Sequence, residues 1–284
     1  EFQIGGVVVM PTVGELKTVP GTLENPGEGY RSRFNKKDEH SEPGYYSVLL
    51  KDYNIKAELT ATERVGFHRY TFPESKQSRL VFDIGNKQGE SSDVIEAFAQ
   101  LVNENEIEGY VETYPEYAKF CDPENHVKMY FIARLNKTPE EVGTFIDSKT
   151  EPGKSLTKGV RNGIYLAFPT SENEVVEMQV GLSYTSIENA RLNLETEAAD
   201  ITFDEVKSTA TKKWNEMLSR IQVEDGNVEN KTKFYTGLYH ALLGRGIASD
   251  VNGKYKLNGE GTGRIPLDEN GKPRHNHINT DGVW

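Results

Sequence analysis

Apolar and polar residues alternate along many short runs in the first part of the chain, which is the two-residue period of β-strands with one buried face. In the run 45–51, for example, Tyr46 and Val48 share one face. The runs that this pattern predicts as strands are 45–51, 55–62, 66–72, 79–84, 107–113, 127–135, 143–146, 163–168 and 175–182. Strands at this spacing, without helical patterns between them, predict a mainly β fold, an antiparallel β-sandwich, and exclude a parallel α/β fold.

The strand pattern also predicts which side chains form the core. A slip of one residue would exchange the two faces of a strand, so burial tests the predicted register. The side chains expected to be mostly buried are Tyr46, Val48, Leu59, Ala61, Phe82, Tyr130, Ile132 and Val180.

The period changes toward the end of this β-rich part. Apolar residues recur every three or four positions in 202–221 and again in 230–243, which predicts two amphipathic helices. Thr202 followed by Glu205 is the signature of a capping box at the start of the first helix. We expect Trp214 of this helix to pack against the sandwich and to join the two parts.

The hydrophobic pattern therefore divides the chain into two parts. Residues 1–200 are predicted to form the β-sandwich domain, and residues 201–284 the linker helices and the start of a helical domain. The run 186–198 fits a helix loosely, and Gly244 is expected to stop the second strong helix. Beyond Gly244 lie about 30 polar, turn-rich residues, and a connection of this length in a compact domain is usually functional.

Composition narrows the classes of partner. The chain has 284 residues, 36% of them hydrophobic, a formal net charge of −11 and a pI near 5.2. A globular protein of this size can bury a sizeable core, and its negative charge disfavours nucleic acid and anionic lipid partners. No run approaches the roughly 20 apolar residues that span a bilayer, and no signal-peptide pattern opens the sequence.

The polar clusters outside the last segment carry weaker signals. Cys121 is the only cysteine, so no intrachain disulfide forms. Because no histidine partner is evident near it in the sequence, we expect its side chain to fill space in the core or on the surface rather than to act as a nucleophile. Glu39, His40 and Glu42 precede a Pro-Gly turn and are predicted to lie in a polar loop. They either line a ligand site or cap local backbone groups in a solvated turn.

One long run resembles a known family. Residues 33–73 read RFNKKDEHSEPGYYSVLLKDYNIKAELTATERVGFHRYTFP. Their blocks PGYYSV, AELTAT and GFHRYTFP follow the order and spacing seen near the amino terminus of family 92 glycoside hydrolases, the calcium-dependent exo-acting α-mannosidases. The later segments VGLSYTSIENARLNLETE and FYTGLYHALL are also similar to this family, so the resemblance spans nearly the whole chain.

The resemblance implies both a fold and an activity. The expected fold is a galactose-mutarotase-like supersandwich followed by the first helices of an (α/α)6 toroid. The implied enzyme is periplasmic or secreted, and it removes terminal α-linked mannose from glycans by an inverting, calcium-dependent mechanism. In the family both catalytic carboxylates and most calcium ligands come from the later part of the toroid, so no catalytic residue is assigned in this segment, which alone is expected to be inactive.

The last ten residues of the sequence are the candidate substrate-binding segment. Alternation would place four of its polar side chains on one side of an extended chain, and Trp284 could stack on a sugar ring. The candidate residues are His275, His277, Asn279, Asp281 and Trp284. Another interpretation makes Trp284 the start of a helix with Asp281 as its N-cap. A zinc site at the two histidines is less well supported, because no cysteine or H-x-x-x-H spacing accompanies them.

The family resemblance is imperfect at this segment. The corresponding place in the family commonly shows a W-D-T-like segment that holds mannose, whereas this sequence reads TDGVW at 280–284. If Asp281 takes the place of the family aspartate, its register is displaced by about one residue.

Two other classes of protein share some of these features. A stand-alone carbohydrate-binding or scaffold module would also be a β-sandwich, but it would not need the amphipathic helices at 202–243. Glucoamylases and disaccharide phosphorylases combine a sandwich with a toroid, yet their motifs are not found in this sequence. Fold alone does not decide among these classes.

Overall fold

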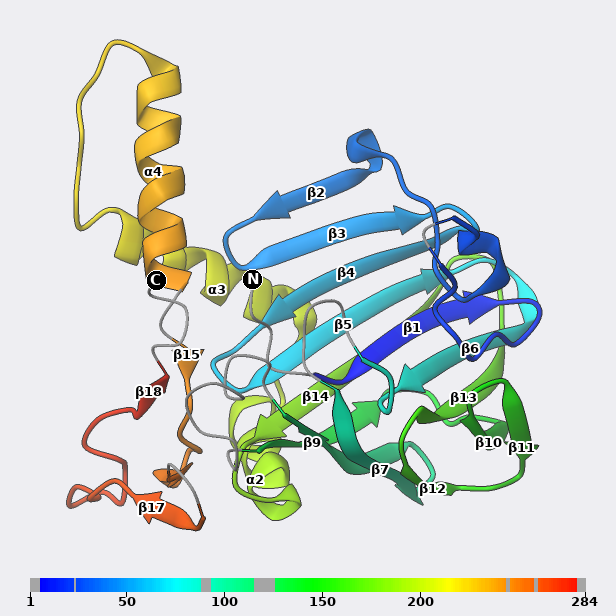
Figure 1. The fold of residues 1–284 in the computed structure, drawn as a ribbon. Coiled ribbons are helices and arrows are strands. Elements are labelled where there is room, and N and C mark those ends of the chain that lie inside the picture. Colours follow the sequence, from blue (N-terminus) through cyan, green and yellow to red (C-terminus); the bar gives the residue numbers. More distant parts are fainter. Residues whose placement is uncertain are drawn as a thin grey trace.

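Two antiparallel sheets packed face to face form most of the molecule (Figure 1). The structure is a computed structural model, which describes residues 6–22, 24–87, 93–114, 126–243, 246–257 and 260–279. The larger sheet has the strand order β12-β7-β8-β9-β14-β5-β4-β3-β2, and the smaller has the order β1-β6-β13-β10-β11. The fold is therefore the predicted antiparallel sandwich, followed by helices.

The strands have the following bounds: β1 Val8–Val13, β2 Glu39–Glu42, β3 Tyr45–Leu50, β4 Ile55–Ala61, β5 Val65–Phe72, β6 Ser75–Asp83, β7 Val94–Asn103, β8 Glu106–Thr113, β9 Val127–Leu135, β10 Glu141–Ile146, β11 Lys149–Pro152, β12 Leu156–Gly159, β13 Asn162–Thr170 and β14 Glu174–Ser183. The helices are α2 Ile187–Glu197, α3 Phe203–Leu218 and α4 Val228–Leu243, with short 3-10 turns at Pro26–Glu28 and Lys36–Asp38. No helix among the described residues is both long and apolar enough to cross a membrane.

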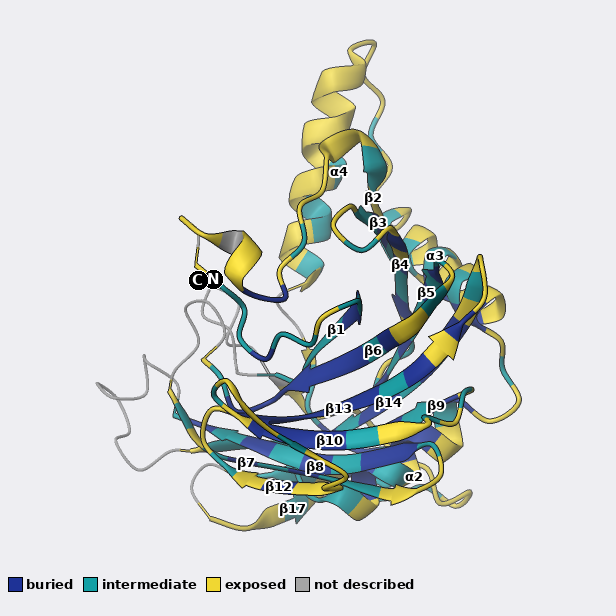
Figure 2. Ribbon diagram, turned by 90° about the vertical axis from the view of Figure 1, so that its right-hand side faces the viewer, coloured by how far each residue is buried: buried dark blue, intermediate teal, exposed yellow. Residues whose placement is uncertain are grey.

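The main core lies between the two sheets, where dark-blue strands face each other in Figure 2. Phe72 of the larger sheet meets Phe168 of the smaller one edge to face, with ring centroids 5.7 Å apart. Phe82 and Phe131, each 0% exposed, fill the same layer. Burying side chains of this size contributes on the order of 2 kcal/mol each, before entropy is counted.

A second apolar layer covers the outer face of the larger sheet. In β5, Tyr70 and Phe72 point into the main core, whereas Val65 and Phe67 point outward and pack against the helices. Helix α2 lies very close to β14. A Cβ atom added at Gly181 would lie only 2.5 Å from the Ala190 carbonyl oxygen, so the close approach requires glycine at this position. The larger sheet is thus a middle layer, buried on both faces where the helices cross it.

The predicted core is largely but not wholly confirmed. Four of the eight expected residues are buried: Val48, Phe82, Ile132 and Val180. Tyr46, Leu59 and Tyr130 are half-buried, and the prediction for Ala61 was wrong because this residue is exposed. Ala61 is the last residue of β4, where the strand leaves the sandwich.

The loop predicted around Glu39, His40 and Glu42 is also wrong. These residues form β2, an edge strand that pairs with β3. An edge strand open to solvent needs no apolar face, and charged side chains on it discourage pairing with other chains. Alternation of apolar and polar residues therefore could not reveal it.

Helix α3 is attached to the sandwich at its first turns. The capping box is formed as predicted: Thr202 accepts from the Glu205 amide, and the Glu205 carboxylate accepts from the Thr202 amide. The buried side chains of this helix are Phe203, Val206 and Ala210. The guanidinium of Arg69 on β5 lies 4.1 Å from the centroid of the Phe203 ring, a cation-π contact.

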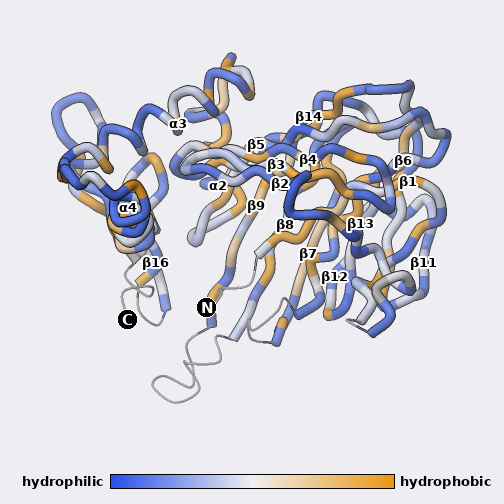
Figure 3. The backbone as a smooth tube through the Cα atoms, turned by 90° about the horizontal axis from the view of Figure 1, so that it is seen from above, coloured by the Kyte–Doolittle hydropathy of each residue, from blue (hydrophilic) through white to orange (hydrophobic). Residues whose placement is uncertain are grey.

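The expected role of Trp214 was wrong. Its ring is half-buried and packs on Tyr239 of α4, with ring centroids 4.8 Å apart, rather than on the sandwich. Trp214 lies three turns beyond Phe203, where α3 has already passed the covered part of the sheet. Seen from above, α4 lies to one side of the two sheets, and none of its residues is buried (Figure 3).

The attachment of α3 predicts a difference between two aromatic substitutions. Phe203→Ala should lower the free energy of unfolding by about 3–5 kcal/mol, because it removes a fully buried ring. Trp214→Ala should cost clearly less, because its ring is only half-buried. Urea unfolding followed by circular dichroism measures both losses, and equal losses would contradict this assignment of the joint.

A half-buried histidine on β5 predicts the pH dependence of stability. Burial lowers the pKa of the His68 imidazole from its ordinary 6.5 to about 4. Because the folded pKa is depressed, the neutral ring contributes stability above pH 6.5, and this contribution is lost as the pH falls toward 4. The full loss is on the order of 3 kcal/mol.

Urea unfolding at pH 7 and pH 4.5 tests this dependence. His68→Gln should show a smaller drop in stability between the two values than the parent chain does. His40→Gln, which replaces a side chain that is 60% exposed, is the matched control and should keep the parent drop. An equal decrease in the free energy of unfolding in all three proteins would show that His68 does not cause the loss of stability at low pH.

Candidate functional site

After α4 the chain turns back to the sandwich and forms what we call the tail, residues 246–279. It contains four short strands that pair as β15 with β18 and β16 with β17 (Figure 1). Their bounds are β15 Gly246–Ile247, β16 Lys254–Lys256, β17 Thr262–Arg264 and β18 Ile278–Asn279. The tail therefore passes the sandwich twice, first at 246–250 and later at 276–279.

A buried carboxylate anchors the first pass. Asp250 is 3% exposed and accepts hydrogen bonds from Thr185 Oγ1 at 2.5 Å and from Asn193 Nδ2 at 2.8 Å. Asn193, on α2, is 0% exposed, and its Oδ1 accepts from the Val251 amide at 2.9 Å. Buried polar groups that are fully paired fix one arrangement of the chain, since any other would leave them without partners.

Arg64, in the turn between β4 and β5, reaches both passes. Its Nη1 donates to Glu197 Oε1 at 2.6 Å and its Nε to the Ser249 carbonyl oxygen at 2.6 Å. Its Nη2 lies 3.4 Å from Asn276 Oδ1. The guanidinium thus links the end of α2 to two separate points of the tail.

The structure places two of the predicted site residues fully. His277 stacks on Tyr255, with ring centroids 4.2 Å apart and planes inclined by 16°. Its amide donates to Ser249 Oγ at 3.1 Å, and its carbonyl oxygen accepts from the Ala248 amide at 2.9 Å. His275 is exposed and lies in a bend before the extended stretch begins.

The other three predicted residues are described only in part. Asn279 belongs to β18, where its backbone pairs with Gly246. Asp281 and Trp284 lie outside the described residues, as do Cys121 and the expected helix stop at Gly244. The common face predicted for His275, His277, Asn279 and Asp281 therefore stays a prediction.

A cleft of about 330 Å³ separates the tail from the sandwich. Its walls come from the β4–β5 turn with Arg64, from the end of β14, and from 246–250. The cleft lies beside the residues that sequence reasoning selected, but the groups that shape it are others. One of these had a signal in the sequence: Asn193 lies one helical turn after Asn189 beside apolar residues, and buried amides require polar partners.

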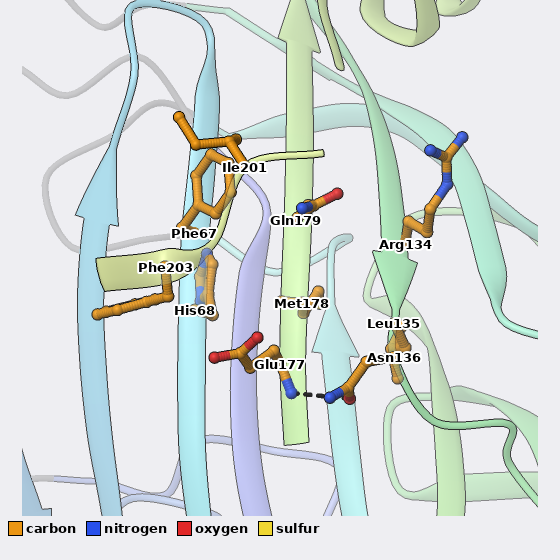
Figure 4. Close-up of a pocket in the computed structure, with 10 residues that line it drawn as sticks. All are labelled: Phe67, His68, Arg134, Leu135, Asn136, Glu177, Met178, Gln179, Ile201 and Phe203. Atoms are coloured by element: carbon orange, nitrogen blue, oxygen red, sulfur yellow. Dashed lines mark hydrogen bonds between the residues drawn. The ribbon is translucent and has the colours of Figure 1, made fainter. Parts of the chain in front are cut away.

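A second cleft, of about 210 Å³, lies on the outer face of the larger sheet under the α2–α3 connection (Figure 4). Its apolar wall is made by Phe67, Ile201 and Phe203. Its polar groups are partly occupied by one another: Asn136 Oδ1 accepts from the Glu177 amide at 2.9 Å, and Glu177 pairs with Arg69. This cleft is part of the joint between sheet and helices.

No three His, Cys, Asp or Glu side chains converge on a possible metal position in the part of the chain that the structure describes. We therefore assign no metal ligand among these residues. What the tail presents instead is a polar, partly aromatic edge: exposed imidazoles, a stacked Tyr255–His277 pair and several amides. Groups of this kind bind hydroxyl-rich, uncharged ligands through hydrogen bonds and ring contacts.

Comparison with known proteins covers nearly the whole length of the chain. The sequence profile of the "Glycosyl hydrolase family 92 N-terminal domain" matches residues 1–183, and that of the "Glycosyl hydrolase family 92 catalytic domain" matches residues 189–284. No curated protein matches the sequence. The division between the two profiles falls just before α2, earlier than the predicted division at residue 200.

Several solved structures are similar in fold. The family GH92 α-mannosidase BT3965 from Bacteroides thetaiotaomicron is 27% identical, with a TM-score of 0.84 over 93% of this chain. The same protein in complex with mannoimidazole gives a TM-score of 0.83, also at 27% identity, over 93% of this chain and 34% of that one. The gh92 family glycosyl hydrolase ccman5 is 26% identical, with a TM-score of 0.74, over 89% of this chain and 35% of that one. The chain spans 35% of the length of BT3965.

Proposed function

This chain belongs to glycoside hydrolase family 92, and on that premise we propose that it is the amino-terminal part of an enzyme that removes terminal α-linked mannose from glycans. The observation that supports the proposal is the similarity over nearly the whole chain, with the sandwich and the first helices in the same order as in a solved α-mannosidase. The amphipathic helices α3 and α4 also favour it over a stand-alone binding module.

In this proposal the chain supplies the β-sandwich, the first helices and the edge, or rim, of the sugar site. It does not supply the general acid and base of the enzyme. An inverting glycosidase needs two carboxyl groups about 6.5–9.5 Å apart, one to protonate the leaving oxygen and one to activate water. From the family resemblance we expect both in the later part of the helical toroid, so we assign neither to this chain. The exposed face of α4 is then the surface on which the further helices pack.

The tail is proposed as the rim of the sugar site. His275 and His277 would donate or accept hydrogen bonds at sugar hydroxyls, and Asn279, Asp281 and Trp284 would extend the same edge. Calcium dependence is proposed for the longer enzyme on the family resemblance alone. The described residues of this chain offer no cluster that fits the ion, so no step is derived through it. A periplasmic or secreted location is proposed on the same resemblance.

Because the acid and the base are assigned to a part of the enzyme outside this chain, the proposal predicts which proteins should show α-mannosidase activity. The 284-residue chain by itself should not hydrolyse α-mannosides, because a missing acid and base cost about 10²–10⁴-fold each. A longer protein that contains the chain should hydrolyse them, and a calcium chelator should abolish that activity until calcium is returned. Release of mannose from a mannobiose measures both.

An Asp281→Ala variant of the isolated chain serves as the control for this assay. Mannobiose turnover by the isolated chain that Asp281→Ala abolishes would overturn the division of parts. The active site would then lie within the present sequence.

A further inference from the structure

Arg64 occupies the point where three segments distant in sequence meet. Its side chain is 9% exposed, and its main ionic partner, Glu197 at the end of α2, is 14% exposed. Of its other contacts, one goes to Glu63 Oε2 at 3.3 Å and two go to the tail, to the Ser249 carbonyl oxygen and toward Asn276 Oδ1. Charge-assisted hydrogen bonds shielded from water in this way are stronger than exposed ones.

The direction of the guanidinium is fixed from the sandwich side. Glu197 Oε2 accepts from Thr62 Oγ1 at 2.6 Å and from the Arg64 amide at 2.9 Å, while Oε1 accepts from Nη1. The carboxylate is therefore held in place by the β4–β5 turn itself. Because the five guanidinium donors form a rigid planar fork, fixing Nη1 also fixes where Nε and Nη2 point.

The two remaining nitrogen atoms, Nε and Nη2, reach both passes of the tail close to the predicted rim. Ser249, whose carbonyl oxygen accepts from Nε, also accepts the His277 amide at its side chain. Asn276 stands between His275 and His277 in the sequence. Asp250, by contrast, bonds to Thr185 and Asn193 and so holds the first pass.

We propose that Arg64 is a positioning residue: held by Glu197, it sets the place of segment 275–279 against the sandwich and thereby the place from which His275 and His277 face a sugar. The link to sugar binding depends on the proposed function, whereas the placement of the tail does not.

Amide hydrogen exchange on the full chain tests the placement. Arg64→Gln should speed exchange of the Ala248 and His277 amides by about tenfold or more, because both donate hydrogen bonds between the two passes of the tail that Arg64 holds. Arg64→Lys keeps the charge opposite Glu197 but lacks the fork, and it should give an intermediate rate. If Arg64→Gln does not fold, Arg64→Lys carries the same comparison.

The matched control is Arg69→Gln. Arg69 also sits on the larger sheet and pairs with two carboxylates, Glu177 and Asp204, which belong to β14 and α3. Its loss should speed exchange at the start of α3 and leave Ala248 and His277 unchanged. Unchanged tail exchange in Arg64→Gln, or the same acceleration in Arg69→Gln, would overturn the proposal.

Kinetics of the longer enzyme test the link to the sugar. With an aryl α-mannoside, Arg64→Gln should raise KM about tenfold and change kcat less than about threefold, since a displaced rim weakens ground state and transition state alike. A fall in kcat at constant KM would refute the positioning role at the sugar. A parent enzyme without α-mannosidase activity would refute the proposed function, and the exchange result would still decide the placement of the tail.

Discussion

The structure depends on a sheet that is apolar on both of its faces. Along β5 the side chains alternate, yet Val65 and Phe67 on one side are as deeply buried as Tyr70 and Phe72 on the other. Leaving either face in water would expose several large side chains, each worth on the order of 2 kcal/mol. The smaller sheet covers one face and helices α2 and α3 cover the other, so the change from strands to helices completes the packing of the sheet.

The tail is attached to the sandwich and α2 by hydrogen bonds, several of which involve charged groups, rather than by apolar packing. Its contacts with the sandwich and α2 include a buried carboxylate, two buried asparagines and a shielded arginine. Apolar contacts tolerate sliding, whereas a network of paired polar groups tolerates only the arrangement that pairs them all. A rim that must hold sugar hydroxyls at fixed places needs the second kind of attachment.

The candidate site could be predicted from the sequence only in outline. Histidines, an asparagine and an aspartate in a turn-rich segment indicated that the tail carries polar chemistry, and His277 does lie beside the cleft. The residues that hold the segment, Arg64, Asn193 and Asp250, were not selected. Each of them is an ordinary surface residue by type, and each pairs with a residue more than 50 positions away, which the local sequence does not reveal.

The sequence by itself determined nine of the fourteen strands of the two sheets, the sandwich and the start of α3, because alternation and a capping box are properties of neighbouring residues; it did not reveal β1, β2, β7, β11 and β12. Tertiary structure decided which apolar helix residues meet the sheet, so that Phe203 rather than Trp214 became the joint. It also made a strand of the polar run at 39–42, since an edge position supplies pairing without any apolar face. Local pattern states what a segment can bury, and only the packed neighbours determine what it does bury.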